Sequence, residues 1–116
     1  MQKLVIFIDP GDNPITFHES WPEFLALAEK MPGLTRESTS HVESLLYGRF
    51  DYEFIHELYF QSMDSMKAAL ASPEGRAAGK KLQEITKGQL VLFYADHNED
   101  SSENISQYRS QDKDAS

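Results

Sequence analysis

The sequence predicts an α+β fold of the ferredoxin-like type, in which a four-stranded antiparallel sheet carries helices on one face. Two apolar runs, over residues 3–8 and 89–95, have the length and the β-branched or aromatic content of strands. Between them lie two segments with helical hydrophobic spacing and two strand-like segments that follow each other directly. The order strand, helix, strand, strand, helix, strand is that of a split β-α-β sandwich.

The first strand and the first helix have clear limits. Residues 3–8 are apolar on both faces, which is typical of a central strand. Two capping pairs with Glu three residues later begin at Thr16 and Ser20. Pro22 interrupts a helix that begins at Thr16, but it is tolerated in the first turn of one that begins at Ser20. We therefore expect an irregular first turn and then a regular helix to Met31, ended by a Pro-Gly pair.

The middle of the chain predicts a hairpin. Residues 34–46 are polar and β-branched, which favours a weakly buried strand at an edge or on a wet face of the sheet. Residues 47–51 contain a glycine and form the turn. Residues 52–60 alternate between two faces and form the third strand.

The last third of the chain predicts a broken helix, a strand and a tail. Ser62 can cap a short helix, and Ser72 followed by Pro73 begins another, because serine suits the N-cap and proline the first helical position. After the strand over 89–95, residues 97–116 are acidic and polar with almost no apolar side chains, so we expect a disordered tail. The folded domain then covers residues 1–96.

Composition excludes several partners and predicts one. The chain of 116 residues has no cysteine and a net charge of −8, which argues against nucleic acid or an anionic membrane as a partner. The first apolar run is too short for a membrane span or a signal peptide, so we expect a cytoplasmic protein. The first and last strands are apolar on both faces, yet the helices cover one face. The simplest cover for the other is a second copy of the chain, which predicts a homodimer.

With this architecture, the sequence resembles the EthD family over about residues 2–96. The matching segments are Lys3-Leu4-Val5, Met31-Pro32-Gly33-Leu34, Glu57-Leu58-Tyr59-Phe60, Met66 to Leu70, and Ala71-Ser72-Pro73-Glu74-Gly75-Arg76. The resemblance implies a dimeric α+β barrel with a small-molecule cleft between sheet and helices, and it calls for no cofactor. The family name is commonly associated with oxidoreductases, and similar folds host cofactor-independent monooxygenases and lyases, so the fold does not choose the reaction.

The sequence departs from that family at one position. Many relatives carry a histidine in the first helix, about eight residues before the Pro-Gly pair. Here that position is Phe24, and the nearest histidine is His18, two helical turns earlier. The resemblance therefore does not supply a catalytic histidine in the first helix.

The candidate catalytic residues are His41, Glu43 and His56. If Tyr47 pairs with Tyr52 across the turn, the antiparallel register places Glu43 opposite His56, with His41 on the same face. A carboxylate beside an imidazole raises the pKa of the imidazole and orients it, which suits a general base near neutral pH. The alternatives are a hydrogen-bonded pair on a wet face, or a metal site, for which no spacing motif is present.

Aromatic and sulfur-containing side chains as a group predict an apolar ligand cleft, although core packing is the better explanation of any single one. The candidate ligand-binding residues are His18, Trp21, Phe24, Tyr47, Tyr59 and Met66. His18, just before the tryptophan, could act as an acid or base at the edge of a cleft or be an ordinary surface residue at a helix start.

Two functions follow from these features. The first is a cofactor-independent oxidoreductase or lyase that acts on a small apolar or aromatic metabolite through a His/Glu acid–base pair. The second is a non-catalytic ligand-binding or accessory protein of a degradation pathway, which the missing helix histidine favours. A haem or metal protein of the same fold is a third reading.

Overall fold

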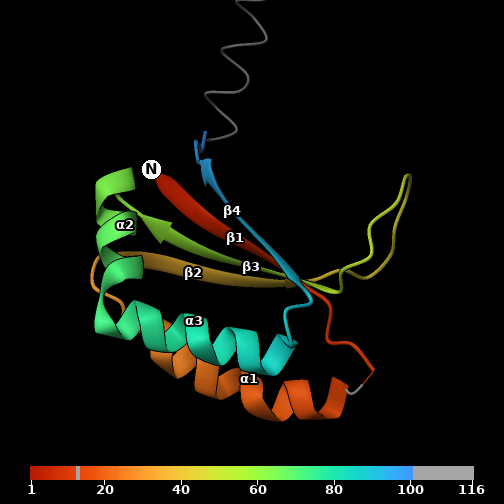
Figure 1. Ribbon diagram of the computed structural model, residues 1–116. Coiled ribbons are helices and arrows are strands. Elements are labelled where there is room, and N and C mark those ends of the chain that lie inside the picture. Colours follow the sequence, from red (N-terminus) through yellow and green to blue (C-terminus); the bar gives the residue numbers. More distant parts are fainter. Residues whose placement is uncertain (13, 101–116) are drawn as a thin grey trace, which may run out of the picture.

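The computed structural model describes residues 1–12 and 14–100, and it has the predicted α+β ferredoxin-like architecture (Figure 1). Its sheet has the strand order β2-β3-β1-β4, and all neighbouring strands are antiparallel. Helices α1 and α3 lie side by side beneath one face of the sheet, and α2 packs at one end (Figure 1). The elements in chain order are β1 (Gln2–Ile8), α1 (Pro14–Ala28), β2 (Leu34–His41), β3 (Phe54–Phe60), α2 (Met63–Ala71), α3 (Pro73–Thr86) and β4 (Leu90–Asp96).

The core lies between the sheet and the helices. Even-numbered residues of β1 and β3 face the helices, because Leu4 pairs with Leu58 and Ile6 with His56 across the two central strands. Phe24 of α1 packs against this helix-facing side of the sheet and is almost fully buried. No helix of the described part of the chain is long and apolar enough to cross a membrane.

Helix α1 begins six residues earlier than predicted, so the expectation of a helix from Ser20 to Met31 is wrong. The helix starts at Pro14, and Pro22 lies in its interior. The ring of Pro22 is exposed, so water can reach the carbonyl group that its missing N–H leaves unpaired. The earlier start also buries Phe17, which is 3% exposed and stacks on Trp21 at 5.3 Å between ring centroids. Burying an aromatic side chain of this size stabilises the fold by about 2 kcal/mol, which offsets part of the proline cost.

The junction of α2 and α3 has the predicted serine–proline start. The backbone at Ser72 is extended, its hydroxyl oxygen accepts a hydrogen bond from the Gly75 N–H at 3.0 Å, and Pro73 follows at the first helical position. The same hydroxyl donates to the Ala69 carbonyl at the end of α2. One side chain therefore caps two helices.

We expect Ser72→Ala to lower the free energy of unfolding by about 1–2 kcal/mol, because it leaves the Gly75 N–H without its cap and removes one of two donors to the Ala69 carbonyl, which keeps the Ser72 N–H. Urea unfolding followed by circular dichroism measures this loss. Ser72→Gly is the matched comparison: glycine is itself an acceptable N-cap, so it should cost less than alanine. Equal losses in the two variants would contradict the capping role.

Strands β2 and β3 are shorter than predicted, and their register differs by four residues. His41 pairs with Phe54 and Thr39 with His56, so the predicted pairing of Glu43 with His56 is wrong. The chain reverses at Tyr47 and Gly48, where Gly48 has a φ of 88° that favours glycine. The predicted turn was centred two residues later. Because each residue of turn displacement moves the pairing by two, this accounts for the whole shift.

Residues 42–53 form a projecting arm between β2 and β3 (Figure 1). They contain neither helix nor strand. At the base of the arm, the Val42 N–H donates to the Glu53 carbonyl and the Glu53 N–H donates to the Ile8 carbonyl. Phe50 and Tyr52 of the arm still pack on Phe7 of β1, and the end of the arm extends away from the sheet and the helices (Figure 1).

The outer face of the sheet, opposite the helices, is aromatic at one end and charged at the other. Phe7 packs against Phe50 and Phe93, with ring centroids 5.0 and 5.2 Å apart. At the other end, Tyr59 lies under the Arg36 guanidinium at 4.2 Å. The outer face of the sheet is therefore apolar at one end and charged at the other, whereas the inner face is apolar.

The first residues of the predicted tail contact this charged end. The His97 N–H donates to the Met1 carbonyl, and Glu99 forms an ion pair with Arg36 at 2.9 Å. The remaining part of the predicted tail, residues 101–116, lies outside the described residues.

Candidate functional site

A buried histidine lies where β2 and β3 face helix α1. His56 is on the helix-facing side of β3, and its side chain is 0% exposed. Glu37 and Thr39 of β2 are on the same side, because Thr39 pairs directly with His56 and Glu37 with the next inward residue, Leu58. Strand alternation therefore brings a carboxylate, a hydroxyl and an imidazole together.

Both ring nitrogens of His56 have hydrogen-bond partners. Nε2 lies 3.1 Å from the Glu37 Oε2 atom, and Nδ1 lies 2.8 Å from the Thr39 Oγ1 atom. With a neutral ring and an ionised carboxylate, one assignment satisfies all three groups: Nε2–H donates to Glu37, and the Thr39 hydroxyl donates to Nδ1. The hydroxyl, ring and carboxylate then form a chain of two hydrogen bonds that ends at Glu37.

Burial shifts the pKa values of both members of this pair. It lowers the pKa of His56 from 6.5 to about 4, against a smaller opposite effect of the Glu57 carboxylate on the other side of β3. It raises the pKa of Glu37 above the ordinary 4.5, and the neighbouring carboxylate of Glu29 adds to this rise. The prediction that the carboxylate raises the imidazole pKa is therefore wrong, because desolvation dominates.

Aromatic rings enclose the histidine from the helix side. The Trp21 and Phe24 rings meet the His56 ring edge to face, at centroid distances of 5.1 and 5.7 Å. Trp21 is only half-buried, and the Glu37 side chain is 19% exposed. Solvent or a ligand therefore reaches the pair at the Glu37 carboxylate and not at the imidazole.

The structure brings some of the predicted site residues together and separates others. The hydrogen-bond partners of His56 are Glu37 and Thr39 and not His41. The rings of His41 and the exposed His18 pack on Phe54, at centroid distances of 5.0 and 5.5 Å. Glu43 lies in the arm, away from His56. Of the predicted ligand-binding residues, Trp21 and Phe24 adjoin His56, Tyr47 is 96% exposed at the end of the arm, Tyr59 lies on the outer face, and Met66 is fully buried in the core.

Glu37 is the residue that sequence reasoning missed. The predicted strand over 34–46 already contained it, and its alternation places Glu37, Thr39 and His41 on one face. Only the pairing register of β2 with β3 was lacking. Because Glu43 lies on the same face, two positions beyond His41, the register decides which of the two carboxylates lies near His56. A turn centred between Tyr47 and Gly48 would have placed Thr39 opposite His56 and Glu37 opposite Leu58, on the same face.

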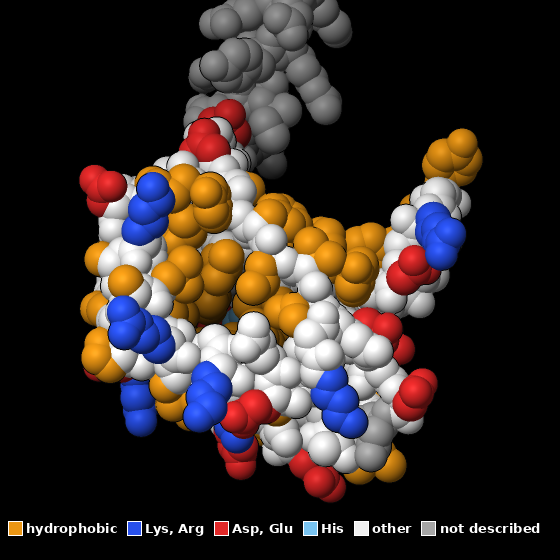
Figure 2. Space-filling model, in the orientation of Figure 1, with side chains coloured by type: hydrophobic (Ala, Val, Ile, Leu, Met, Phe, Trp, Pro, Cys, Tyr) orange, Lys and Arg blue, Asp and Glu red, His pale blue; other side chains and the backbone are white. Residues whose placement is uncertain are grey.

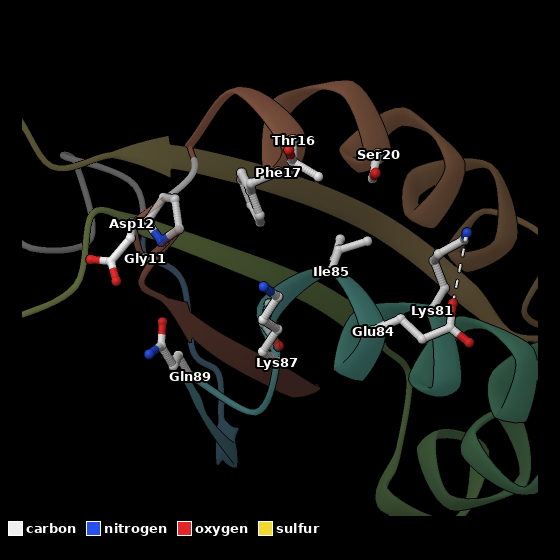
Figure 3. A pocket seen from close by; sticks show the side chains of 12 residues that line it. Gly11, Asp12, Thr16, Phe17, Ser20, Lys81, Glu84, Ile85, Lys87 and Gln89 are labelled. Atoms are coloured by element: carbon white, nitrogen blue, oxygen red, sulfur yellow. Dashed lines mark ion pairs between the residues drawn. The ribbon is translucent and has the colours of Figure 1, made fainter.

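A cavity of about 320 Å³ opens between α1, α3 and the loop after β1 (Figure 3). Phe17 and Ile85 line it beside charged side chains, and the Lys87 side chain extends toward Phe17 in Figure 3. Lys81 at its far end pairs with Glu23 at 2.7 Å. Phe17 also stacks on Trp21, so this aromatic wall stands between the cavity and the His56 pair.

An apolar groove runs beneath the edge strand β4. Leu92 pairs with Ile6 and Tyr94 with Leu4, so both point to the helix-facing side, yet they are 53% and 57% exposed. Figure 2 shows a hollow between the sheet and the helices that is lined by hydrophobic side chains. Within residues 1–12 and 14–100, no three His, Asp or Glu side chains are grouped so that they could hold a metal ion.

The fold and this site define a ferredoxin-like α+β domain with a buried His/Glu pair and apolar surface between sheet and helices. A family model described as "EthD domain" matches residues 10–84, so the chain belongs to the EthD family, as the sequence resemblance predicted. No curated protein matches the chain.

Solved structures agree on the fold. An EthD-family protein from Bacillus halodurans has a TM-score of 0.75 and 22% identity, over 84% of this chain and 99% of that one. A hydroxynitrile lyase from Passiflora edulis has a TM-score of 0.71 and 12% identity, over 86% and 95%. A protein described as dimeric, ferredoxin-like and of unknown function, from Thermobifida fusca, has a TM-score of 0.63 and 16% identity, over 83% and 90%. At these identities the likeness shows the fold alone.

Proposed function

We propose that this EthD-family protein transfers a proton to and from a small apolar or aromatic metabolite, with Glu37 as the acid–base group. The observation that carries the proposal is the partly exposed Glu37 carboxylate, 3.1 Å from a fully buried imidazole. A carboxylate with a raised pKa holds a proton more strongly than an ordinary one, so it is the better base. The reaction is that of a lyase or of a cofactor-independent oxidoreductase, since both can begin by removing a proton from the substrate.

His56 acts in this proposal as a positioning residue. It is 0% exposed and cannot touch a ligand at the surface, but its Nε2–H fixes one oxygen of Glu37. The other carboxylate oxygen of Glu37 remains available to a ligand. The half-buried Trp21 ring, which packs on His56, offers an aromatic surface at this site, which suits an apolar or aromatic body.

Proton transfer can be measured without knowing the natural substrate. We expect the protein to exchange the α-protons of an aromatic ketone such as phenylacetone with deuterium oxide, followed by proton NMR. Glu37→Gln should slow this exchange by at least about 100-fold, the usual worth of a positioned general base. Glu29→Gln, which removes a neighbouring exposed carboxylate, should leave the rate within a few fold. Equal rates in the Glu37 variant and the unaltered protein would contradict the proposal.

A second candidate is non-catalytic ligand binding in the groove beneath β4. It is favoured by the exposure of Leu92 and Tyr94 on the helix-facing side. In that case Leu92→Ser should abolish retention of an aromatic ligand in native mass spectrometry, whereas Glu37→Gln should have no effect on retention or on proton exchange.

We further propose that the protein is a homodimer joined through the outer face of the sheet. Val91 and Phe93 are 38% and 39% exposed there, beside the aromatic cluster around Phe7. Similar ferredoxin-like proteins are described as dimeric, which supports this assembly. Two outer faces related by a two-fold axis would cover each other's apolar side chains.

A further inference from the structure

The end of the projecting arm is apolar and is exposed among the described residues. Leu46 and Tyr47 are 97% and 96% exposed, and Leu45 is 52% exposed. Figure 2 shows hydrophobic side chains at the very end of the arm, beyond a polar stem. A leucine and a tyrosine held this far from the protein body gain nothing from folding, which indicates that another surface covers them.

The backbone of the arm is also unpaired. Among the described residues, no backbone–backbone hydrogen bond involves residues 43–52; the bonds of Val42 and Glu53 close only the base. Open N–H and C=O groups of this kind readily pair with the free edge of another sheet.

The sheet has one free edge that matches the arm in chemistry. β2 and β4 are the two edge strands. The described side chains of β2 beyond Leu34 are polar throughout, whereas β4 exposes Leu92 and Tyr94 on its helix-facing side. Apolar surface on the arm therefore complements β4 and not β2.

The arm is long enough to reach that edge in a partner. Two stacked sheets lie about 10 Å apart. The five residue-to-residue steps from Val42 to Tyr47 can extend up to about 17 Å. If two outer faces stack, the end of the arm passes the partner's sheet and lies at its edge, where the apolar groove opens.

We propose that residues 42–53 of each copy cover the groove beneath β4 of a second copy, so that Leu46 and Tyr47 complete the partner's apolar groove. This inference rests on the homodimer proposed above. It assigns to Tyr47 a place in the groove of the partner copy, although among the described residues of its own chain the tyrosine is 96% exposed. The groove is then a composite of two chains, and a single copy leaves it open.

The first test measures dimer dissociation by sedimentation equilibrium. We expect the double variant Leu46→Ser with Tyr47→Ser to raise the dissociation constant at least about 100-fold, because each of two arms loses two buried apolar side chains. Ile15→Ser is the matched control: it removes an apolar side chain that is 70% exposed on α1, far from the outer face, and should leave dissociation unchanged.

The second test locates the arm on its partner. The chain has no cysteine, so introduced cysteines react alone. With a short bis-maleimide linker, we expect Tyr47→Cys combined with Leu92→Cys to give covalent dimers, and the combination of Tyr47→Cys with Ile15→Cys to give none.

The outcomes separate the two proposals. A monomeric unaltered protein would overturn the homodimer and, with it, the arm contact. A dimer whose dissociation does not respond to the arm variant, or whose Tyr47 position links equally to both test positions, would overturn the arm contact and leave the homodimer standing.

Discussion

Gly75→Ala is expected to lower the free energy of unfolding by about 3 kcal/mol or more. Gly75 lies in the first turn of α3, where this helix meets the end of α2. A Cβ atom added there would collide with the Ala69 carbonyl oxygen and lie 2.9 Å from the Leu70 Cα atom. These are backbone atoms, so relief requires that the two helices move apart, and overpacking against backbone has costs of this size. Urea unfolding at a fixed protein concentration measures the loss.

Gly79→Ala is the matched control in the same helix. A Cβ atom at Gly79 meets nothing within 4 Å. Alanine is the better helix former, so this variant should gain about 0.5–1 kcal/mol. Losses of similar size at both positions would contradict the close approach of α2 as the cause of the effect at Gly75. A large loss at Gly75 alone would explain why glycine follows the serine–proline–glutamate start of α3.

The contribution of His56 is expected to lower the free energy of unfolding by about 3 kcal/mol as the pH is lowered from 7 to 4. Burial sets the pKa of His56 in the folded protein at about 4, against 6.5 when unfolded. Between these values the unfolded chain binds a proton that the folded one does not, so the free energy of unfolding decreases as pH falls. Each pH unit is worth about 1.4 kcal/mol. Above pH 6.5 the contribution is fully present.

The measurement is a series of urea unfolding curves between pH 7.5 and 4. Glu37, which faces His56 from β2, acts in the opposite direction, since its raised pKa favours the folded state as it takes up a proton. His56→Gln should be less stable at pH 7 but should show a flatter dependence between pH 6.5 and 4. His41→Gln, at an exposed histidine, should keep the slope of the unaltered protein. An unchanged slope in the His56 variant would contradict a buried neutral imidazole.

Local sequence signals predicted most of the fold, because they act over a few residues. The apolar run at the start fixes β1, and the Ser72-Pro73 pair fixes the start of α3. Helix α1 was misplaced because an interior proline is usually excluded, and only the burial of Phe17 in three dimensions shows why Pro22 is tolerated.

The candidate site was predicted only in part, because it depends on register. His56 and a carboxylate partner on the polar strand were both expected, but the partner is Glu37 and not Glu43. A turn misplaced by two residues changes every cross-strand pair, and no local property of β2 distinguishes the alternatives. The depth of His56 could not be predicted either, since it depends on Trp21 and Phe24 of a helix distant in sequence.

The unlike edges of the sheet bear on how far assembly can proceed. A sheet in which both edge strands can pair with other sheets can join them edge to edge without limit, as in fibrils. Here one edge, β2, is lined by Thr35, Arg36 and Ser40, which water solvates well, and the other, β4, is apolar. When another sheet adds to β4, the pair therefore has no second apolar edge to which a further sheet can add. The asymmetry favours a closed assembly of defined size over an open polymer, and it protects a protein with an apolar edge strand from aggregation.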